Sequence, residues 1–279
     1  YPRTDQARQR DVKFISASES DYVLSPQECR HSTLYMEKRA VQGEPTVFSE
    51  TFEYTSCGEW HNLRAEDVLP YDTTTALYKE YTAEREKHIV FSPRLRELAA
   101  KLTAGETNPY LKAKRIFRWI NDHFPWASAR EYSTIENIPE YVLDNRHGDC
   151  GQVSLLFITL CRISGIPAHF QSGFMMHPRA WNLHDWAEVY FEGVGWVPVD
   201  QSFGIPAFAR NADEEFFFLG GIDSWRMIVN TDYGMPLVPE KKYPRSETVD
   251  FQRGEVEWEG GNLYFPQWSY HMDIDYLNY

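Results

Sequence analysis

Cys150 lies in a segment suited to a nucleophile, between Gly148 and Gly151 and directly before a long apolar run. A thiol attacks only as the thiolate, and its pKa of about 8.5 falls at a helix N-terminus or beside a protonated imidazole. The apolar run predicts a helix that begins at Cys150, where unpaired amides and the helix dipole favour the anion. The two glycines would let a substrate carbonyl approach. Asp149 would oppose thiolate formation, so we expect its carboxylate to face away from the sulfur.

A base and a group to orient it follow later in the chain. His184 opens the strand-like segment HDWAEVYFE, and Asp200 ends the next one, WVPVD. The glycine turn at residues 193–195 predicts that these two strands form an antiparallel hairpin. His184 and Asp200 would then be cross-strand neighbours at one edge of a sheet packed on the Cys150 helix. A Cys-His-Asp triad needs this arrangement, in which the carboxylate fixes the imidazole tautomer and stabilises its cation.

Each member of this set also has a structural interpretation. Cys150 could be a small buried residue, His184 a structural histidine and Asp200 a turn former. Their order, spacing and predicted secondary structure agree with one another, so we favour the triad. Cys161 lies inside the apolar run, and we interpret it as a core residue.

The other histidines fit catalysis less well. His147 lies close before Cys150 and is an alternative base, although the sequence offers it no carboxylate partner. We interpret His169 and His177 as structural or peripheral. A metal site built from His147, His177, His184 and Asp185 stays open, but its spacing matches no zinc pattern.

Two kinds of element must position these residues. The first ninety or so residues alternate apolar and polar positions between turns, which predicts a β-rich region followed by a polar connector at residues 69–88. Ser92 and Asn108 each precede a proline, which predicts two helix starts. A further helix is expected within residues 138–146. On the Cys150 helix, one broad apolar face is expected from Val153, Leu156, Phe157, Leu160 and Ile163.

The period then changes to two, which predicts three consecutive strands over residues 168–176, 184–192 and 195–202. Beyond residue 209 the chain is rich in loops. The segment EFFFLGGIDSWRMIVN fits either helix or strand, and a further hairpin is expected around residues 260–261.

Composition excludes several classes of protein. The chain of 279 residues carries a net charge of −13, which argues against nucleic acid or an anionic membrane as the main partner. Its 42% hydrophobic residues suffice for a packed core, and no apolar run is long enough to span a membrane. Four cysteines are too few for a disulfide scaffold, although Cys29 and Cys57 could pair in an exported protein.

The segments RHGDCGQVSLLFITLCRISGIPAHFQSGF and HDWAEVYFEGVGWVPVDQSFG resemble the transglutaminase-like superfamily of papain-like cysteine enzymes. In that family, G-x-C-[GW], H-x-W/A-x-E-V and G-W-x-x-x-D motifs supply nucleophile, base and acid. The matching positions here are Cys150, His184 and Asp200, within residues 110–204. The resemblance implies an α+β fold whose nucleophile helix packs on an antiparallel sheet. We expect a β-rich N-terminal domain with its connector at residues 1–88.

Residues 89–279 would form the catalytic domain with a C-terminal extension, as in multi-domain bacterial members of the family. The implied chemistry is acyl transfer through a thioester on Cys150. The Cys150 amide would bind the oxyanion together with Trp126 or Tyr132, and Gln152 is a weaker candidate for contact with the substrate. No calcium loop is visible in the sequence, so we expect no metal and no cofactor.

These observations predict a cysteine-dependent hydrolase or acyltransferase that acts on peptide, protein or peptidoglycan-like amides. Hydrolysis is favoured over transamidation, because nothing in the chain suggests an amine acceptor. The alternative is an inert transglutaminase-like module that binds peptide or glycan through the N-terminal region and the aromatic C-terminal tail. The chain starts at Tyr1 without Met and has no N-x-S/T sequon, from which we expect an exported bacterial protein, periplasmic or at the cell surface.

Overall fold

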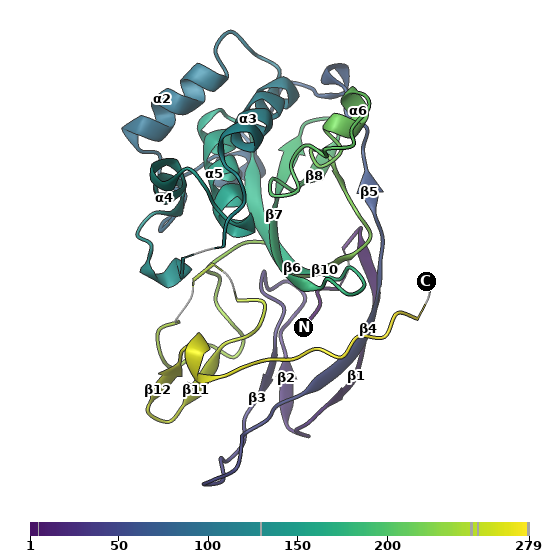
Figure 1. The fold of residues 1–279 in the computed structure, drawn as a ribbon, viewed down its shortest axis with the longest axis vertical. Coiled ribbons are helices and arrows are strands. Elements are labelled where there is room, and N and C mark those ends of the chain that lie inside the picture. Colours follow the sequence, from purple (N-terminus) through teal and green to yellow (C-terminus); the bar gives the residue numbers. More distant parts are fainter. Residues whose placement is uncertain (5, 129, 246–247, 250, 278–279) are drawn as a thin grey trace.

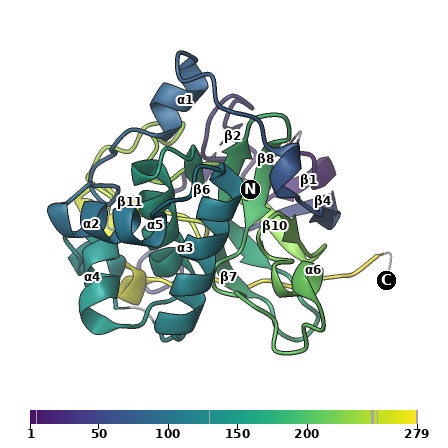
Figure 2. The same cartoon turned by 90° about the horizontal axis from the view of Figure 1, so that it is seen from above.

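The computed structural model describes residues 1–4, 6–128, 130–245, 248–249 and 251–277. A layer of helices covers one face of an antiparallel sheet (Figure 1, Figure 2). The helices of this layer are α2 (Pro93–Leu102), α3 (Pro109–His123), α4 (Ile138–Asn145) and α5 (Cys150–Ile163). This is the mixed α and β architecture with antiparallel sheets that the sequence predicts.

The helices begin where the sequence places their caps. The Ser92 side chain accepts a hydrogen bond from the amide of Leu95 at 3.2 Å, and Asn108 does the same for Leu111 at 3.2 Å. In both cases a proline occupies the first turn, where its missing N–H costs nothing. The two predicted helix starts are therefore confirmed.

Helix α5 is the centre of the fold. It packs against α2, α3 and α4 as well as against the sheet, so residues 151–162 are all buried. The predicted apolar face is part of this core, and the other side of the helix is buried as well, because a helix that is surrounded on all sides buries its whole circumference. Cys161 is fully buried, which confirms it as a core residue.

The sheet has the order β10-β6-β7-β8, and each neighbouring pair is antiparallel. Its strands are β6 (Ala168–Met175), β7 (Asn182–Phe191), β8 (Gly195–Val199) and β10 (Arg226–Asn230). The three consecutive strands and the turn with Gly193 at positive φ agree with the sequence pattern. The fourth strand, β10, comes from the segment that fitted either helix or strand.

Short strands dominate the N-terminal region, as its alternating pattern predicts. β1 (Gln9–Ala17) pairs with β4 (Glu50–Ser56), β2 (Tyr22–Leu24) with β3 (Leu34–Met36), and β5 (Glu59–Trp60) with β9 (Gly221–Ile222). The β5–β9 pair joins this region to the rest of the chain, as do two hydrogen bonds of the Gln9 side chain, which donates to the Ile228 carbonyl at 2.8 Å and accepts from the Ile228 amide at 2.7 Å. The domain boundary at residue 88 stays a prediction. Helix α1 (Ala76–Tyr81) lies within the predicted connector.

The C-terminal region adds the short helix α6 (Ala212–Glu215) and the hairpin of β11 (Val256–Trp258) and β12 (Gly261–Leu263). The hairpin confirms the turn expected at residues 260–261. Single 3-10 turns lie at Ala65–Asp67, Tyr132–Thr134 and Phe265–Gln267. Within the described part of the chain, every helix is too short or too polar to span a bilayer.

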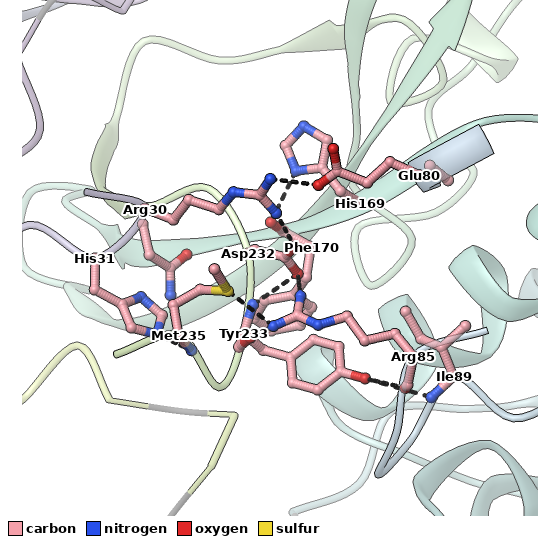
Figure 3. A network of polar contacts seen from close by, with 12 residues as sticks. Arg30, His31, Glu80, Arg85, Ile89, His169, Phe170, Asp232, Tyr233 and Met235 are labelled. Carbon is pink, nitrogen blue, oxygen red and sulfur yellow. Dashed lines mark hydrogen bonds and ion pairs between the residues drawn. The ribbon is translucent and has the colours of Figure 1, made fainter. Parts of the chain in front are cut away.

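A buried ion cluster also links the N-terminal region to the core. The Asp232 carboxylate is 1% exposed and pairs with Arg30, at 3.0 Å, and with Arg85 (Figure 3). Arg30 pairs in addition with Glu80 of α1. Asp232 therefore joins three segments that are distant in the sequence.

We expect Asp232→Asn to destabilise the protein by about 2–3 kcal/mol, because it leaves two arginines without their shared buried counterion. The matched control is Asp213→Asn, which removes an exposed pair with Arg64 and should cost less than about 1 kcal/mol. Urea unfolding curves of both variants measure the difference. Equal losses would show that the buried cluster contributes no more than a surface pair.

Candidate active site

Cys150 is the first residue of α5 and is half-buried. Asp149 is the N-cap of this helix: its carboxylate accepts the Gln152 amide at 3.1 Å and the Tyr132 hydroxyl. Burial raises the pKa of Asp149, although these hydrogen bonds favour its ionised form. The Asp149 carboxylate therefore has a structural task in holding the start of the nucleophile helix.

The glycines beside Cys150 leave room for the protein's own side chains. A Cβ on Gly151 would lie 2.5 Å from the Tyr132 hydroxyl and 2.6 Å from Asp185 Oδ2. A Cβ on Gly148 would lie 3.3 Å from Val142, where α4 packs on α5. The interpretation of both glycines as space for a substrate carbonyl was therefore wrong, because packed atoms fill that space.

The structure brings His184 and Asp200 together. His184 Nε2 lies 2.7 Å from Asp200 Oδ2, and both residues are buried. The β7–β8 ladder ends at the pair Ala187 and Val199, so Asp200 follows the last paired residue. Asp200 is therefore not directly opposite His184. The two residues are diagonal neighbours on adjacent strands, and their side chains are long enough to meet.

Arg226 of β10 also contacts Asp200. Its Nη1 atom lies 2.9 Å from Asp200 Oδ2, and its Nη2 atom lies 2.7 Å from Asp223 Oδ2. Burial alone would raise the pKa of Asp200, but His184 and Arg226 outweigh it and lower this pKa to about 2. Asp200 is therefore a stable anion at neutral pH.

The ring of Phe203 covers this cluster. It lies 4.7 Å from the Arg226 guanidinium carbon and 5.4 Å from the His184 ring. His177 Nε2 lies 3.3 Å from Asp223 Oδ1, so His177 contacts the second carboxylate that Arg226 binds. Sequence reasoning missed Arg226, because it lies on a strand that the local pattern left ambiguous.

Cys150 itself touches the residue next to His184. Its Sγ atom lies 3.6 Å from Asp185 Oδ2. Adjacent strand residues point to opposite faces, and Asp185 shares its face with Ala187, which packs in the same core as α5. His184 is on the face of Trp186, which belongs to a separate buried cluster. The described contacts thus connect the predicted nucleophile to Asp185 and the predicted base to Asp200.

The three candidates for oxyanion or substrate contact differ in their surroundings. Tyr132 is buried, and its hydroxyl donates to Asp149 at the start of α5. The Trp126 side chain is 62% exposed, and its backbone forms a bridge with Gly148. Gln152 is buried, and its Oε1 accepts the Asp149 amide at 3.3 Å, which completes a capping box.

The other cysteines and histidines take structural positions. Burial raises the pKa of the Cys161 thiol well above its ordinary value, while Cys29 and Cys57 are free thiols. His169 pairs with Glu188 at 3.1 Å, and the His147 ring packs edge-on against Tyr141. Among the residues that the structure describes, no three His, Cys, Asp or Glu side chains are placed to hold a metal ion.

Comparison with known proteins defines the class of this core. Residues 96–201 match the model of the transglutaminase-like superfamily, so this part of the chain has a transglutaminase-like fold. The structure is similar to that of a proposed cysteine protease from Cytophaga hutchinsonii, with a TM-score of 0.54 and 18% identity over 83% of this chain and 73% of that one.

Two curated proteins are each similar to about two fifths of the chain. One is the uncharacterised YebA of Bacillus subtilis, 26% identical over 40% of this chain and 18% of its own length. The other is a protein-glutamine gamma-glutamyltransferase of Pseudomonas aeruginosa, 23% identical over 41% of this chain and 19% of its own length. The chain thus spans less than a fifth of either relative.

Proposed function

We propose that the protein is a cysteine-dependent amide hydrolase or acyltransferase with Cys150 as nucleophile, His184 as base and Asp200 as the group that orients the base. The observation that carries the proposal is the buried contact of 2.7 Å between His184 and Asp200. His184 directly precedes Asp185, whose carboxylate lies next to the Cys150 sulfur. Because Nε2 faces Asp200, Nδ1 is the ring nitrogen left to accept the thiol proton. Catalytic hydrogen bonds are often long in a free enzyme and shorten when substrate binds.

The reaction follows from these roles. The Cys150 thiol gives its proton to His184, and the sulfur attacks the amide carbonyl. The C–N bond then breaks, the leaving amine takes the proton from the imidazolium, and a thioester remains on Cys150. Water or a second amine then attacks the thioester and gives a proton to His184; the C–S bond breaks, the proton returns to the Cys150 sulfur, and the product is an acid or a new amide. Asp200 stabilises the imidazolium throughout.

The substrate in this proposal is an amide of a peptide, a protein or a peptidoglycan-like polymer. The Cys150 amide would bind the oxyanion, with the exposed Trp126 ring as the second donor, whereas the Tyr132 hydroxyl is already donated to Asp149 and Gln152 is buried in the capping box of α5. Hydrolysis is the favoured outcome, while the similarity to a glutamyltransferase keeps transamidation as the alternative. Export to the periplasm or cell surface and action without a cofactor stay predictions from the sequence.

Thiol alkylation tests the proposal without a known substrate. We expect iodoacetamide near neutral pH to modify Cys150 at least about tenfold faster than Cys57, and His184→Ala to remove most of this advantage, since an unassisted thiol is largely protonated there. His123→Ala, which changes an exposed histidine of α3, is the matched control. Mass spectrometry of the labelled peptides gives the rates. Equal labelling of Cys150 with and without His184 would favour an inert binding module instead.

A further inference from the structure

A cavity of 290 Å³ lies between the N-terminal region and the sheet. Residues that precede β1, from β5 and from the end of α1 line it together with residues of strands β6, β7 and β8. His169 and Glu188, which are directly paired on β6 and β7, belong to this lining. Their neighbours Phe170 and Ala187 pack in the core with α5. Because successive strand residues point to opposite faces, the cavity lies on the face of the sheet that α5 does not cover.

The cavity is open to solvent at one end and buried at the other. Ala7 at its rim is exposed, and Tyr81 and Trp196 are partly exposed. At the inner end Arg8 is 5% exposed and Glu188 is 9% exposed. Its volume is at the lower end of the range for small-molecule sites, so it suits a ligand of a single ring.

The charged side chains that line the cavity already have partners. Arg8 Nη1 lies 2.8 Å from Glu59 Oε2, and Arg8 Nη2 lies 3.1 Å from Glu188 Oε1. Glu188 Oε2 accepts a 3.1 Å hydrogen bond from Gln171 Nε2 and lies 3.1 Å from His169 Nε2. Burial alone would raise the pKa of Glu188, but Arg8 and His169 outweigh it and lower this pKa to about 2. A charged ligand would therefore lose its hydration without gaining a counterion, whereas a neutral polar ligand would not.

Three rings form the other side of the cavity. The Trp196 ring lies 5.0 Å from the Tyr81 ring at an interplanar angle of 82°, and 4.4 Å from the His169 ring at 76°. Because these neighbours are nearly perpendicular to Trp196, they do not form a parallel pair of faces that would hold a flat aromatic ligand between them. The arrangement favours a ligand that packs one apolar face on a ring and presents polar groups at its edge.

We propose that this cavity binds one neutral pyranose ring of a sugar. The C–H face of the sugar would pack on Trp196, and its hydroxyls would meet the polar side that Arg8 and Glu188 form. A hydroxyl both donates and accepts hydrogen bonds, so it can bind a carboxylate oxygen and a guanidinium N–H without adding a charge. Thr231 adds a hydroxyl to the lining. The inference goes beyond the proposed amide chemistry and does not depend on Cys150.

Two matched series of sugars test the charge argument on the wild-type protein. Glucose and galactose are the neutral members, their 6-amino-6-deoxy derivatives are cationic, and glucuronic and galacturonic acid are anionic. We expect the neutral sugar of at least one series to bind at least about tenfold more tightly than both charged members, because only it leaves the ion pairs of the cavity intact. Titration calorimetry measures the dissociation constants. Absence of binding by both neutral sugars, or equal binding of a charged member, overturns the proposal.

Variants locate the bound sugar. Trp196→Ala should weaken binding of the neutral sugar at least about tenfold, because the stacking surface is lost. Trp258→Ala changes a tryptophan that is 60% exposed on the β11–β12 hairpin and should leave binding unchanged. Thr231→Ile removes a hydroxyl and narrows the cavity at a partly exposed position, so it provides a test that spares the aromatic side; we expect at least about threefold weaker binding. Wild-type affinity in either folded variant overturns the location.

A free sugar and the end of a glycan offer the same ring, and disaccharides distinguish them. Cellobiose is compared with glucose, and lactose, which ends in galactose, with galactose. A disaccharide that binds as tightly as its monosaccharide assigns the cavity to a glycan end, and one that binds more weakly assigns it to a free sugar. The labelling rates of Cys150 decide the proposed amide chemistry separately, so either proposal can fail while the other stands.

Discussion

Asp200→Asn is expected to lower the proposed amide hydrolysis by about a thousand- to ten-thousandfold, the loss seen when the carboxylate partner of a catalytic histidine is neutralised. The amide keeps the shape of the side chain but no longer stabilises an imidazolium or fixes its tautomer. Asp200 is fully buried and lies 2.7 Å from His184, so solvent cannot replace it. Because Asp200 acts in the chemical step, the substitution should lower kcat strongly and change KM much less.

Labelled casein serves as a general substrate for this comparison, and the rate of Cys150 alkylation serves as a readout that needs no substrate. Asp144→Asn controls for the loss of one negative charge on the protein. Because the pKa of Asp200 is lowered to about 2, its carboxylate stays ionised under all ordinary assay conditions. A loss of activity in mild acid must therefore come from another group. A variant with wild-type turnover would remove Asp200 from the mechanism.

Arg226→Met should destabilise the protein by about 3–5 kcal/mol, because it leaves Asp200 and Asp223 without the cation that bridges them. Arg226 is 1% exposed, so water cannot take its place. The loss should also displace Asp200 from its contact with His184. We therefore expect lower kcat in the fraction of protein that remains folded.

Arg226→Lys separates charge from geometry. Lysine keeps the positive charge but presents a single ammonium group, whereas Arg226 uses two nitrogens for two carboxylates. We expect Arg226→Lys to recover only part of the stability. Urea unfolding measures the free energies, and Arg210→Lys, at an exposed pair with Glu214, is the matched control. Full recovery in Arg226→Lys would show that only the charge matters.

Local chemistry made much of this fold predictable from the sequence. Ser92 and Asn108 mark helix starts because a capping side chain and a following proline act within one turn. The change of period after Gly165 marks the passage from helix to strands, since alternation is a property of neighbouring residues. Gly193 identifies the hairpin through its positive φ. From these local patterns the sequence predicts that His184 and Asp200 lie close together on neighbouring strands.

The remaining features depend on which face of a strand meets which helix. Sequence order placed His184 beside Cys150, but the pleat of β7 turns Asp185 toward the sulfur and His184 toward Asp200. Successive side chains of a strand point to opposite faces, and the local sequence does not show whether His184 or Asp185 faces α5.

The sequence by itself determined the helix starts, the three consecutive strands, the core position of Cys161 and the meeting of His184 with Asp200, because short-range capping, periodicity and turn chemistry encode them. Only the tertiary structure decided what surrounds these residues. Arg226 reaches Asp200 from another strand, and Gln252 reaches Asp185 from a segment 67 residues away. Such contacts arise when distant segments pack on one core, so their partners have no signature in the local sequence.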